Sequence, residues 1–190
     1  MKKNINNYII FYLFILIIFS YFYLYIKHTV GNDSTISEWL INYQGGFTRR
    51  GIIGEISFQI AKIFNFGLRD IIFAFQSIMY VIFTFLLITY IKNVPKNILT
   101  IIAIFSPVFL FYPVAEIEVL ARKEIFLYVG FIYFLKLCNQ TTNKNISLIY
   151  VFLIFPILCL IWEPFIFYLP FALFIIMIQH NVDSLKKINL

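Results

Sequence analysis

Arginine and glycine residues concentrate in one polar stretch, which runs from Glu38 to Glu55 and reads EWLINYQGGFTRRGIIGE. Adjacent glycines such as Gly45 and Gly46 permit positive φ, and backbone N–H groups in such turns can form a concave anion-binding site. Arg49 and Arg50 follow directly, and the planar guanidinium fork suits phosphate oxygens. The stretch therefore predicts a site for a phosphodiester or pyrophosphate group, with these two glycines and two arginines as its binding residues.

The same stretch has a second interpretation that needs no ligand. Gly45-Gly46 can be an ordinary turn, and the two arginines can contact lipid headgroups. Trp39, Tyr43 and Phe47 recur at a spacing that would give the apolar face of a helix lying in the membrane interface. The two interpretations are compatible, because such a helix would hold the arginines at the depth of a lipid-linked phosphate. A second interfacial helix is expected over residues 52–66, from the spacing of Ile53, Ile56, Ile60 and Ile63.

Three carboxylates are candidate catalytic residues: Asp33, Glu38 and Glu163. A carboxylate can deprotonate a sugar hydroxyl that then attacks an anomeric carbon. Each has an alternative explanation. Asp33 and Glu38 also fit the N-cap and first turn of a helix that begins near Ser34. Glu163 lies between two apolar runs and also fits the exposed tip of a helical hairpin.

A further charged cluster runs from Glu116 to Glu124 and contains Arg122, which we expect to be a third phosphate-binding arginine. Glu118 and Arg122 are four residues apart, so an ion pair on one helix face would also explain them. The apolar run after Glu124 is short, so part of this cluster is expected at membrane depth. Charge at that depth is costly and is often functional.

The composition belongs to a membrane protein: 62% of the residues are hydrophobic, 21% aromatic and only 13% charged. Such a chain has too few polar residues for a water-facing globule or a disordered tail. A helix needs about 20 apolar residues to cross a bilayer. The apolar runs predict an all-α, polytopic transmembrane protein in which residues 1–190 form one integral membrane domain. Residues 27–70 are its long first outer loop. Six spans are expected: Tyr8 to Ile26, Ile71 to Ile91, Ile98 to Val114, Val119 or Ile125 to Leu137, Ile146 to Ile161, and Phe165 to Gln179.

The charges separate cleanly between the two sides of this predicted topology. With a cytoplasmic N-terminus, eight lysines and one acid lie inside, whereas all four arginines and eight of the nine carboxylates lie outside. This distribution satisfies the positive-inside rule and puts any chemistry at the outer face. The cations are not clustered among stacking residues, which argues against nucleic-acid binding. No nucleotide motif or metal-ligand spacing is present, so no cofactor and no metal are predicted.

The run Trp39-x-x-Asn42-Tyr43-x-Gly45-Gly46-Phe47-x-Arg49-Arg50-Gly51-x-x-Gly54 resembles a segment of bacterial Wzy-type O-antigen and capsule polymerases. Arg122-Lys123-Glu124 and Trp162-Glu163 resemble later blocks of those proteins, although a His-Glu pair is more usual at the second. The resemblance implies a polysaccharide polymerase of the bacterial inner membrane that transfers a growing glycan from one undecaprenyl diphosphate to the next repeat unit. It also implies that Arg49, Arg50 and Arg122 hold the diphosphate while an outer carboxylate assists attack.

The same resemblance sets the expected partners: polyprenyl-(di)phosphate-linked glycan, membrane lipids and other polysaccharide-assembly proteins. Because such polymerases usually have more than six spans, the chain is expected to be the N-terminal part of a longer protein. Two other functions remain open. One is a GT-C-like glycosyltransferase that uses a polyprenyl-phosphate sugar and a carboxylate of the first outer loop. The other is a non-catalytic flippase or transport subunit, or an inactive fragment. Few polar residues within the spans argue against transport.

Overall fold

The computed structural model describes residues 2–30, 34–140 and 144–188, and side chains within 5–30, 34–139 and 146–178. Its regular structure over these ranges is helical, which confirms the all-α prediction. The first half contains α1 (Lys2–Thr29), α2 (Ser34–Trp39), α3 (Ile52–Phe64) and α4 (Leu68–Asn93). The next rod is α5 (Ile98–Phe105), the π-helical η1 (Pro107–Phe111) and α6 (Tyr112–Ala115). The remaining elements are α7 (Ile117–Leu120), α8 (Glu124–Gln140), α9 (Lys144–Ile149), η2 (Tyr150–Ile154), α10 (Phe155–Ile161), η3 (Glu163–Tyr168) and α11 (Leu169–Ile188).

Three helices are long and apolar enough to cross a membrane, namely Ile5–Thr29, Leu68–Asn93 and Ile98–Ala115. The expectation of six spans is therefore wrong for the part of the chain that the structure describes. Helix α8 has 17 residues, and Ile146–Ile161 and Glu163–Ile178 are also shorter than the 18 residues of the shortest span. At a rise of about 1.5 Å per residue, a helix of 17 residues such as α8 falls short of the roughly 30 Å hydrocarbon core.

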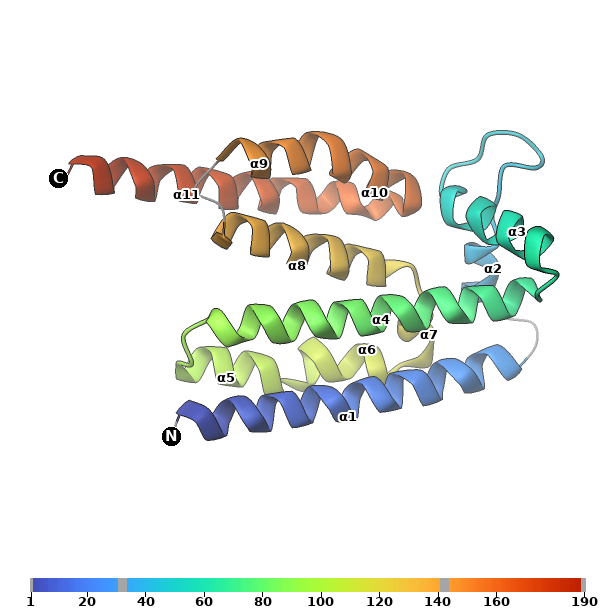
Figure 1. Ribbon diagram of the computed structural model, residues 1–190, viewed down its shortest axis with the longest axis horizontal. Coiled ribbons are helices and arrows are strands. Elements are labelled where there is room, and N and C mark those ends of the chain that lie inside the picture. Colours follow the sequence, from blue (N-terminus) through green and yellow to red (C-terminus); the bar gives the residue numbers. More distant parts are fainter. Residues whose placement is uncertain (1, 31–33, 141–143, 189–190) are drawn as a thin grey trace.

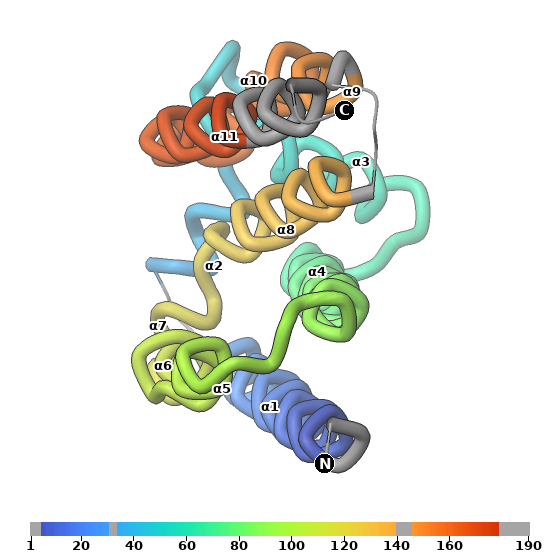
Figure 2. Tube along the Cα trace, turned by 90° about the vertical axis from the view of Figure 1, so that its left-hand side faces the viewer, coloured from blue at the N-terminus to red at the C-terminus, as the bar shows by residue number. Residues whose placement is uncertain are grey.

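The helical rods nevertheless run side by side along one long axis (Figure 1). Helix α4 is central, because α1 packs along one side of it and α8 along another. In the end-on view, α1 and the α5–α6 rod form one side of the bundle, α4 and α8 its middle, and α9, α10 and α11 its other side (Figure 2). Many large apolar side chains of these rods are exposed, as expected where the solvent is hydrocarbon. Examples are Phe11, Phe14, Phe85 and Phe171.

Helices α2 and α3 and the loop between them cover one end of the bundle, which we call the capped end (Figure 1). Helix α1 ends there, α8 begins there, and the junction between α10 and η3 lies nearby. The N-terminus and the α4–α5 connection lie at the opposite end (Figure 1). Lys92 belongs to the last turn of α4, and Lys96 to the connection that follows. The fold thus separates the two sets of charges as the sequence predicts.

The two predicted interfacial helices differ in outcome. Helix α3 is formed, with Ile53 buried and Ile56 and Ile63 exposed, so its isoleucines do not all face one way. The predicted helix with Trp39, Tyr43 and Phe47 on its apolar face is wrong, because α2 ends at Trp39 and the chain then turns. Trp39 is fully buried against Phe126, with ring centroids 5.5 Å apart, and faces protein rather than lipid.

Candidate functional site

The loop between α2 and α3, residues 40–51, is an ordered turn tied to α3. Glu55 of α3 accepts hydrogen bonds from the backbone N–H of Tyr43 (3.0 Å) and from the side chain of Gln44 (2.8 Å). These bonds, with a third from Gln59, lower the pKa of Glu55. The rings of Tyr43 and Phe47 stack with centroids 5.6 Å apart. These contacts give the loop a defined shape. Arg49 and Arg50 come directly after its turn.

Gly45 and Gly46 form the exposed tip of this turn. Gly46 has φ of 116°, which only glycine adopts readily, and its N–H donates to the carbonyl of Tyr43 at 3.1 Å. Neither glycine has an atom of another segment within 4 Å of where a Cβ would stand. The turn explains both residues without a ligand, and the predicted anion-binding role of these glycines stays a prediction.

Arg49 and Arg50 converge on one carboxylate, that of Glu163. Arg49 Nε lies 3.2 Å from Glu163 Oε1, and Arg50 Nη2 lies 3.0 Å from Oε2. The guanidinium of Arg50 also lies 4.6 Å from the ring centroid of Trp162. The hydrogen bond from Arg50 and the charges of both arginines hold the pKa of Glu163 below its ordinary value. The structure thus joins the predicted phosphate-binding pair, Arg49 and Arg50, to Glu163, which the sequence suggested as a catalytic carboxylate.

Arg49, Arg50, Glu163 and Trp162 form what we call the arginine group. Lys123 stabilises this group through the backbone of Arg50. Its side chain is fully buried, and its ammonium donates to the backbone carbonyl of Arg50 at 2.9 Å. Arg50 has a left-handed backbone with φ of 68°, which is uncommon for a residue other than glycine. Burial lowers the pKa of Lys123 to about 8; the charge of Arg50 adds to this shift and that of Glu38 opposes it.

Sequence reasoning missed Lys123 and chose its neighbour. Arg122 is half exposed and pairs with Glu124 at 3.7 Å, so the contact with the Arg50 backbone comes from Lys123 instead. The signal that pointed to Lys123 was the charged cluster expected at membrane depth. One charged side chain of that cluster, Lys123, is buried. Burial alternates along the turn, so Ala121 and Lys123 face the interior while Arg122 between them is exposed.

The candidate carboxylates have separate outcomes. Glu38 is partly buried on α2, and its charge acts on both Lys123 and Glu124. Burial raises the pKa of Glu124, which adds a second acid at this place. Asp33 lies outside the described residues.

The segment that carries Lys123 is held by three side chains from two helices, α2 and α4. Trp39 and Gln76 both donate to the carbonyl of Ala121 at 2.8 Å. The hydroxyl of Tyr80 donates to the carbonyl of Leu120, also at 2.8 Å. Buried backbone carbonyls need such partners, so the bonds fix residues 120–121 where the chain leaves α7. The position of Lys123 under Arg50 therefore depends on this network.

The alternative explanation of Glu118 and Arg122, an ion pair between them on one helix face, does not match the structure. Glu118 is instead bonded to Lys27 of α1 and to the hydroxyl of Thr35, the latter at 3.1 Å. The reason is that α7 ends at Leu120, so residues 118 and 122 do not share a continuous helix face. These bonds tie α7 to α1 and α2 and lower the pKa of Glu118.

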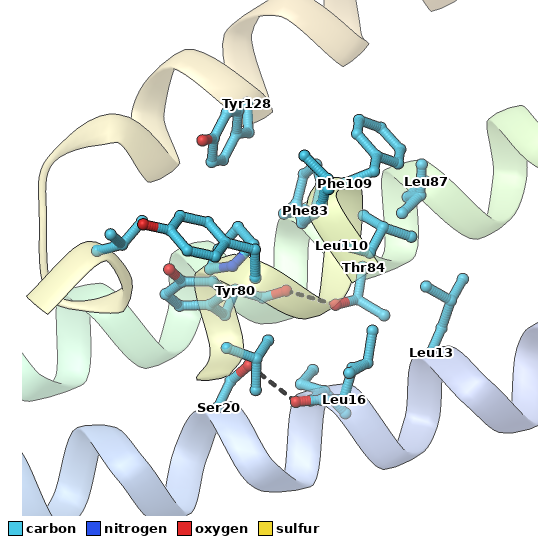
Figure 3. Close-up of a pocket in the computed structure, with 16 residues that line it drawn as sticks. Leu13, Leu16, Ser20, Tyr80, Phe83, Thr84, Leu87, Phe109, Leu110 and Tyr128 are labelled. Atoms are coloured by element: carbon cyan, nitrogen blue, oxygen red, sulfur yellow. Dashed lines mark hydrogen bonds between the residues drawn. The ribbon is translucent and has the colours of Figure 1, made fainter. Parts of the chain in front are cut away.

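An apolar cavity of about 240 Å³ lies within the bundle, between α1, α4, the η1–α6 segment and α8 (Figure 3). Three of its polar side chains are already bonded to backbone carbonyls: Ser20 to Leu16, Thr84 to Tyr80, and Tyr80 to Leu120. The other lining residues are mainly aliphatic and aromatic, among them Leu13, Leu87, Phe83 and Leu110. A cavity of this chemistry accepts hydrocarbon rather than a polar group.

The cavity and the arginine group are connected by a short piece of chain. Val119 lines the cavity, Leu120 accepts the bond from the cavity residue Tyr80, and Lys123 contacts Arg50. A molecule with a charged head and an apolar chain would thus meet cations at the capped end and hydrocarbon side chains deeper in the bundle. In the part of the chain that the structure describes, no group of three or more His, Cys, Asp and Glu side chains could hold a metal ion.

Comparison with models of known protein families, with curated proteins and with solved structures finds no match to this chain.

Proposed function

We propose that the protein acts in surface-polysaccharide assembly, binding a polyprenyl-diphosphate-linked glycan at the outer face of the bacterial cytoplasmic membrane and polymerising or transferring that glycan. The observation that carries this proposal is the convergence of Arg49 and Arg50 on the Glu163 carboxylate. Each guanidinium donates charge-assisted hydrogen bonds to anionic oxygens. Two guanidiniums that bind both oxygens of one carboxylate can therefore also bind two oxygens of a diphosphate.

The surroundings of the arginine pair support an amphiphilic ligand. The pair lies at an end of a bundle with three helices long and apolar enough to span a membrane. The apolar cavity inside the bundle offers room for part of a polyprenyl chain. The predicted orientation, with a cytoplasmic N-terminus, puts the capped end outside, where lipid-linked repeat units are joined.

The second candidate function is that of a GT-C-like glycosyltransferase. The position of the Glu38 carboxylate near Lys123 favours it. This carboxylate belongs to the first outer region and acts on the buried ammonium of Lys123. A carboxylate so placed can accept a proton from an attacking sugar hydroxyl while the arginines hold the leaving phosphate.

The test is the length distribution of the cell's lipid-linked surface glycan, on a gel, with the gene deleted and then restored. A polymerase predicts that deletion collapses the ladder to single complete repeat units. A single-sugar transferase predicts incomplete units. An unchanged ladder would contradict both functions.

The arginine pair can be tested in the same cells. We expect restoration with Arg49→Lys/Arg50→Lys to leave the ladder defective, because lysine cannot donate the two parallel bonds of a guanidinium. Lys62→Gln is the matched control, since it removes an exposed cation of α3 that has no contact with Glu163. A full ladder from the double lysine variant would remove the phosphate-binding role of the pair.

A further inference from the structure

An open apolar groove of about 590 Å³ lies between two walls of the bundle, one formed by η2 and α10 and the other by η3 and α11. Among the described residues that line it are aliphatic and aromatic side chains, a proline and one thiol, but no charged side chain and no hydroxyl. Phe152, Ile166 and Leu173 on its walls are 71%, 58% and 41% exposed. Because α10 and α11 lie on one side of the bundle (Figure 2), hydrocarbon can enter the groove from the membrane.

One end of the groove lies close to the arginine group. Leu160 and Ile166 line the groove, and each is three residues from Glu163 along the chain. Three residues span at most about 11 Å when fully extended, and only about 6 Å along the axis of a 3₁₀ helix such as η3. Glu163 in turn contacts Arg49 and Arg50 at 3.2 and 3.0 Å. The arginine pair therefore lies at this end of the groove.

Both walls run from this end away from the capped end. The junction between α10 and η3 lies near the capped end, and the two walls extend from it along the bundle (Figure 1). The lining residues farthest from Glu163 along the chain are Val151 on one wall and Leu173 on the other. At a rise of about 1.5 Å per residue, the wall from Leu160 back to Val151 is about 14 Å long. The groove thus matches an amphiphile whose anionic head lies at the membrane surface and whose chain runs into the bilayer.

The groove suits a long chain better than the interior cavity does. The cavity is smaller, about 240 Å³, and the hydroxyls of Ser20, Tyr80 and Thr84 belong to its lining residues. Its connection to the arginine group passes through the backbone of residues 119–123. The groove instead begins three residues from Glu163, and its open side lets a chain longer than the groove continue along the helices into lipid.

We propose that the groove between α10 and α11 binds the isoprenoid chain of a polyprenyl diphosphate whose head is bound by Arg49 and Arg50. This inference rests on the proposed function, since it concerns the apolar part of the same ligand. The two cations at its end distinguish the groove from the other exposed apolar faces of the bundle, because they complement an anionic head. Bulk lipid chains or a second copy of the protein would fill the groove without using the arginines, and the experiment separates these occupants.

Photo-crosslinking of the full chain in detergent micelles tests the groove. The probe is a farnesyl diphosphate analogue with a diazirine at the end of its chain, and crosslinked residues are mapped by mass spectrometry. The same diazirine on farnesol, which has no diphosphate, measures the labelling that comes from insertion of the chain alone. We expect the diphosphate probe to label residues 151–160 and 166–173 in excess of the farnesol probe. Excess inorganic pyrophosphate, or Arg49→Lys/Arg50→Lys, should abolish this excess, because each removes binding of the head.

A tryptophan placed in the groove gives a second readout. Leu173 lines the α11 wall and is partly exposed, so Leu173→Trp obstructs the groove without enlarging a core residue. We expect this variant to lose the head-dependent labelling of residues 151–160. Leu153→Trp is the matched control, since Leu153 is an exposed leucine of η2 that does not line the groove. It should keep the wild-type labelling.

Two results would overturn the inference. Head-dependent labelling of cavity residues such as Leu13 and Leu87, in place of the groove, would put the chain in the interior of the bundle. Equal labelling of the groove by both probes would show that it takes hydrocarbon without regard to the arginines. Either result together with a collapsed glycan ladder on gene deletion would reject the groove alone. Head-dependent labelling of the groove with an unchanged ladder would reject the polysaccharide function and leave the groove standing.

Discussion

At the scale of single residues, Lys123 shows how the site is held together. A buried ammonium is costly unless it is hydrogen-bonded, and here its described bond goes to the carbonyl of Arg50. That bond fixes a left-handed residue whose side chain reaches Glu163 and Trp162. Lys123 thus contributes to the arginine group without facing solvent.

The burial of Lys123 predicts a pH dependence of stability. Its pKa is about 8 in the folded protein, against an ordinary value of 10.5. Below pH 8 both states are protonated and the folded state carries the full cost of burial. Between pH 8 and 10.5 only the folded state loses its proton, so the free energy of unfolding rises with pH, by roughly 3 kcal/mol from this group.

The comparison uses Lys123→Met, which does not titrate in this range but shares every other group. We expect the melting temperature of the wild type, relative to that of the variant, to rise between pH 8 and 10.5. A difference in melting temperature that is constant over this interval would show that Lys123 keeps an ordinary pKa.

At the scale of elements, α3 and the preceding loop are locked by a close approach at Gly54. A Cβ on this residue would lie 1.9 Å from the carbonyl oxygen of Ile41 and 2.8 Å from that of Trp39. Both are backbone atoms, which cannot move aside as the end of a flexible side chain can. The glycine therefore lets α3 pack directly against the chain that leaves α2.

Gly54→Ala should consequently loosen the capped end. We expect a loss of about 1–3 kcal/mol in the free energy of unfolding, because the helix must shift to relieve the overlap. Gly45→Ala is the control, since a Cβ there meets nothing within 4 Å. Thermal unfolding in detergent compares the two, and equal melting temperatures would contradict the close packing of α3.

At the scale of the whole molecule, the bundle has two chemically different ends. Its capped end carries the arginines and most of the acids, and the opposite end carries lysines such as Lys92 and Lys96. The positive-inside rule then predicts that the lysine end faces the cytoplasm. This orientation puts the arginine pair outside the membrane.

Cysteine labelling tests the orientation in intact cells. Thr48→Cys at the capped end and Asn93→Cys at the other end are both exposed positions. Each is made with Cys138 and Cys159 replaced by alanine, so that the introduced thiol is the one labelled. A membrane-impermeant maleimide should label position 48 directly and position 93 only after permeabilisation. The reverse pattern would place the arginine pair in the cytoplasm.

Composition and charge order were enough to predict a helical membrane protein and the grouping of its charges at two ends, and residue type alone made Arg49, Arg50 and Glu163 candidate site residues. These are properties of single segments, because the bilayer selects apolar helices by length and composition. Segment length was also the point of error: α8, Ile146–Ile161 and Glu163–Ile178 each have fewer than the 18 residues of the shortest candidate span.

Only the tertiary structure decided which residues meet. Arg50 and Glu163 are 113 positions apart, and Lys123 rather than Arg122 lies under Arg50. Glu118 pairs with Lys27 of α1, because α7 ends before Arg122 and the two residues do not share a helix face. Such pairings depend on where helices end and how rods pack, and both are set by contacts between distant segments. The pattern of any one segment therefore does not contain them.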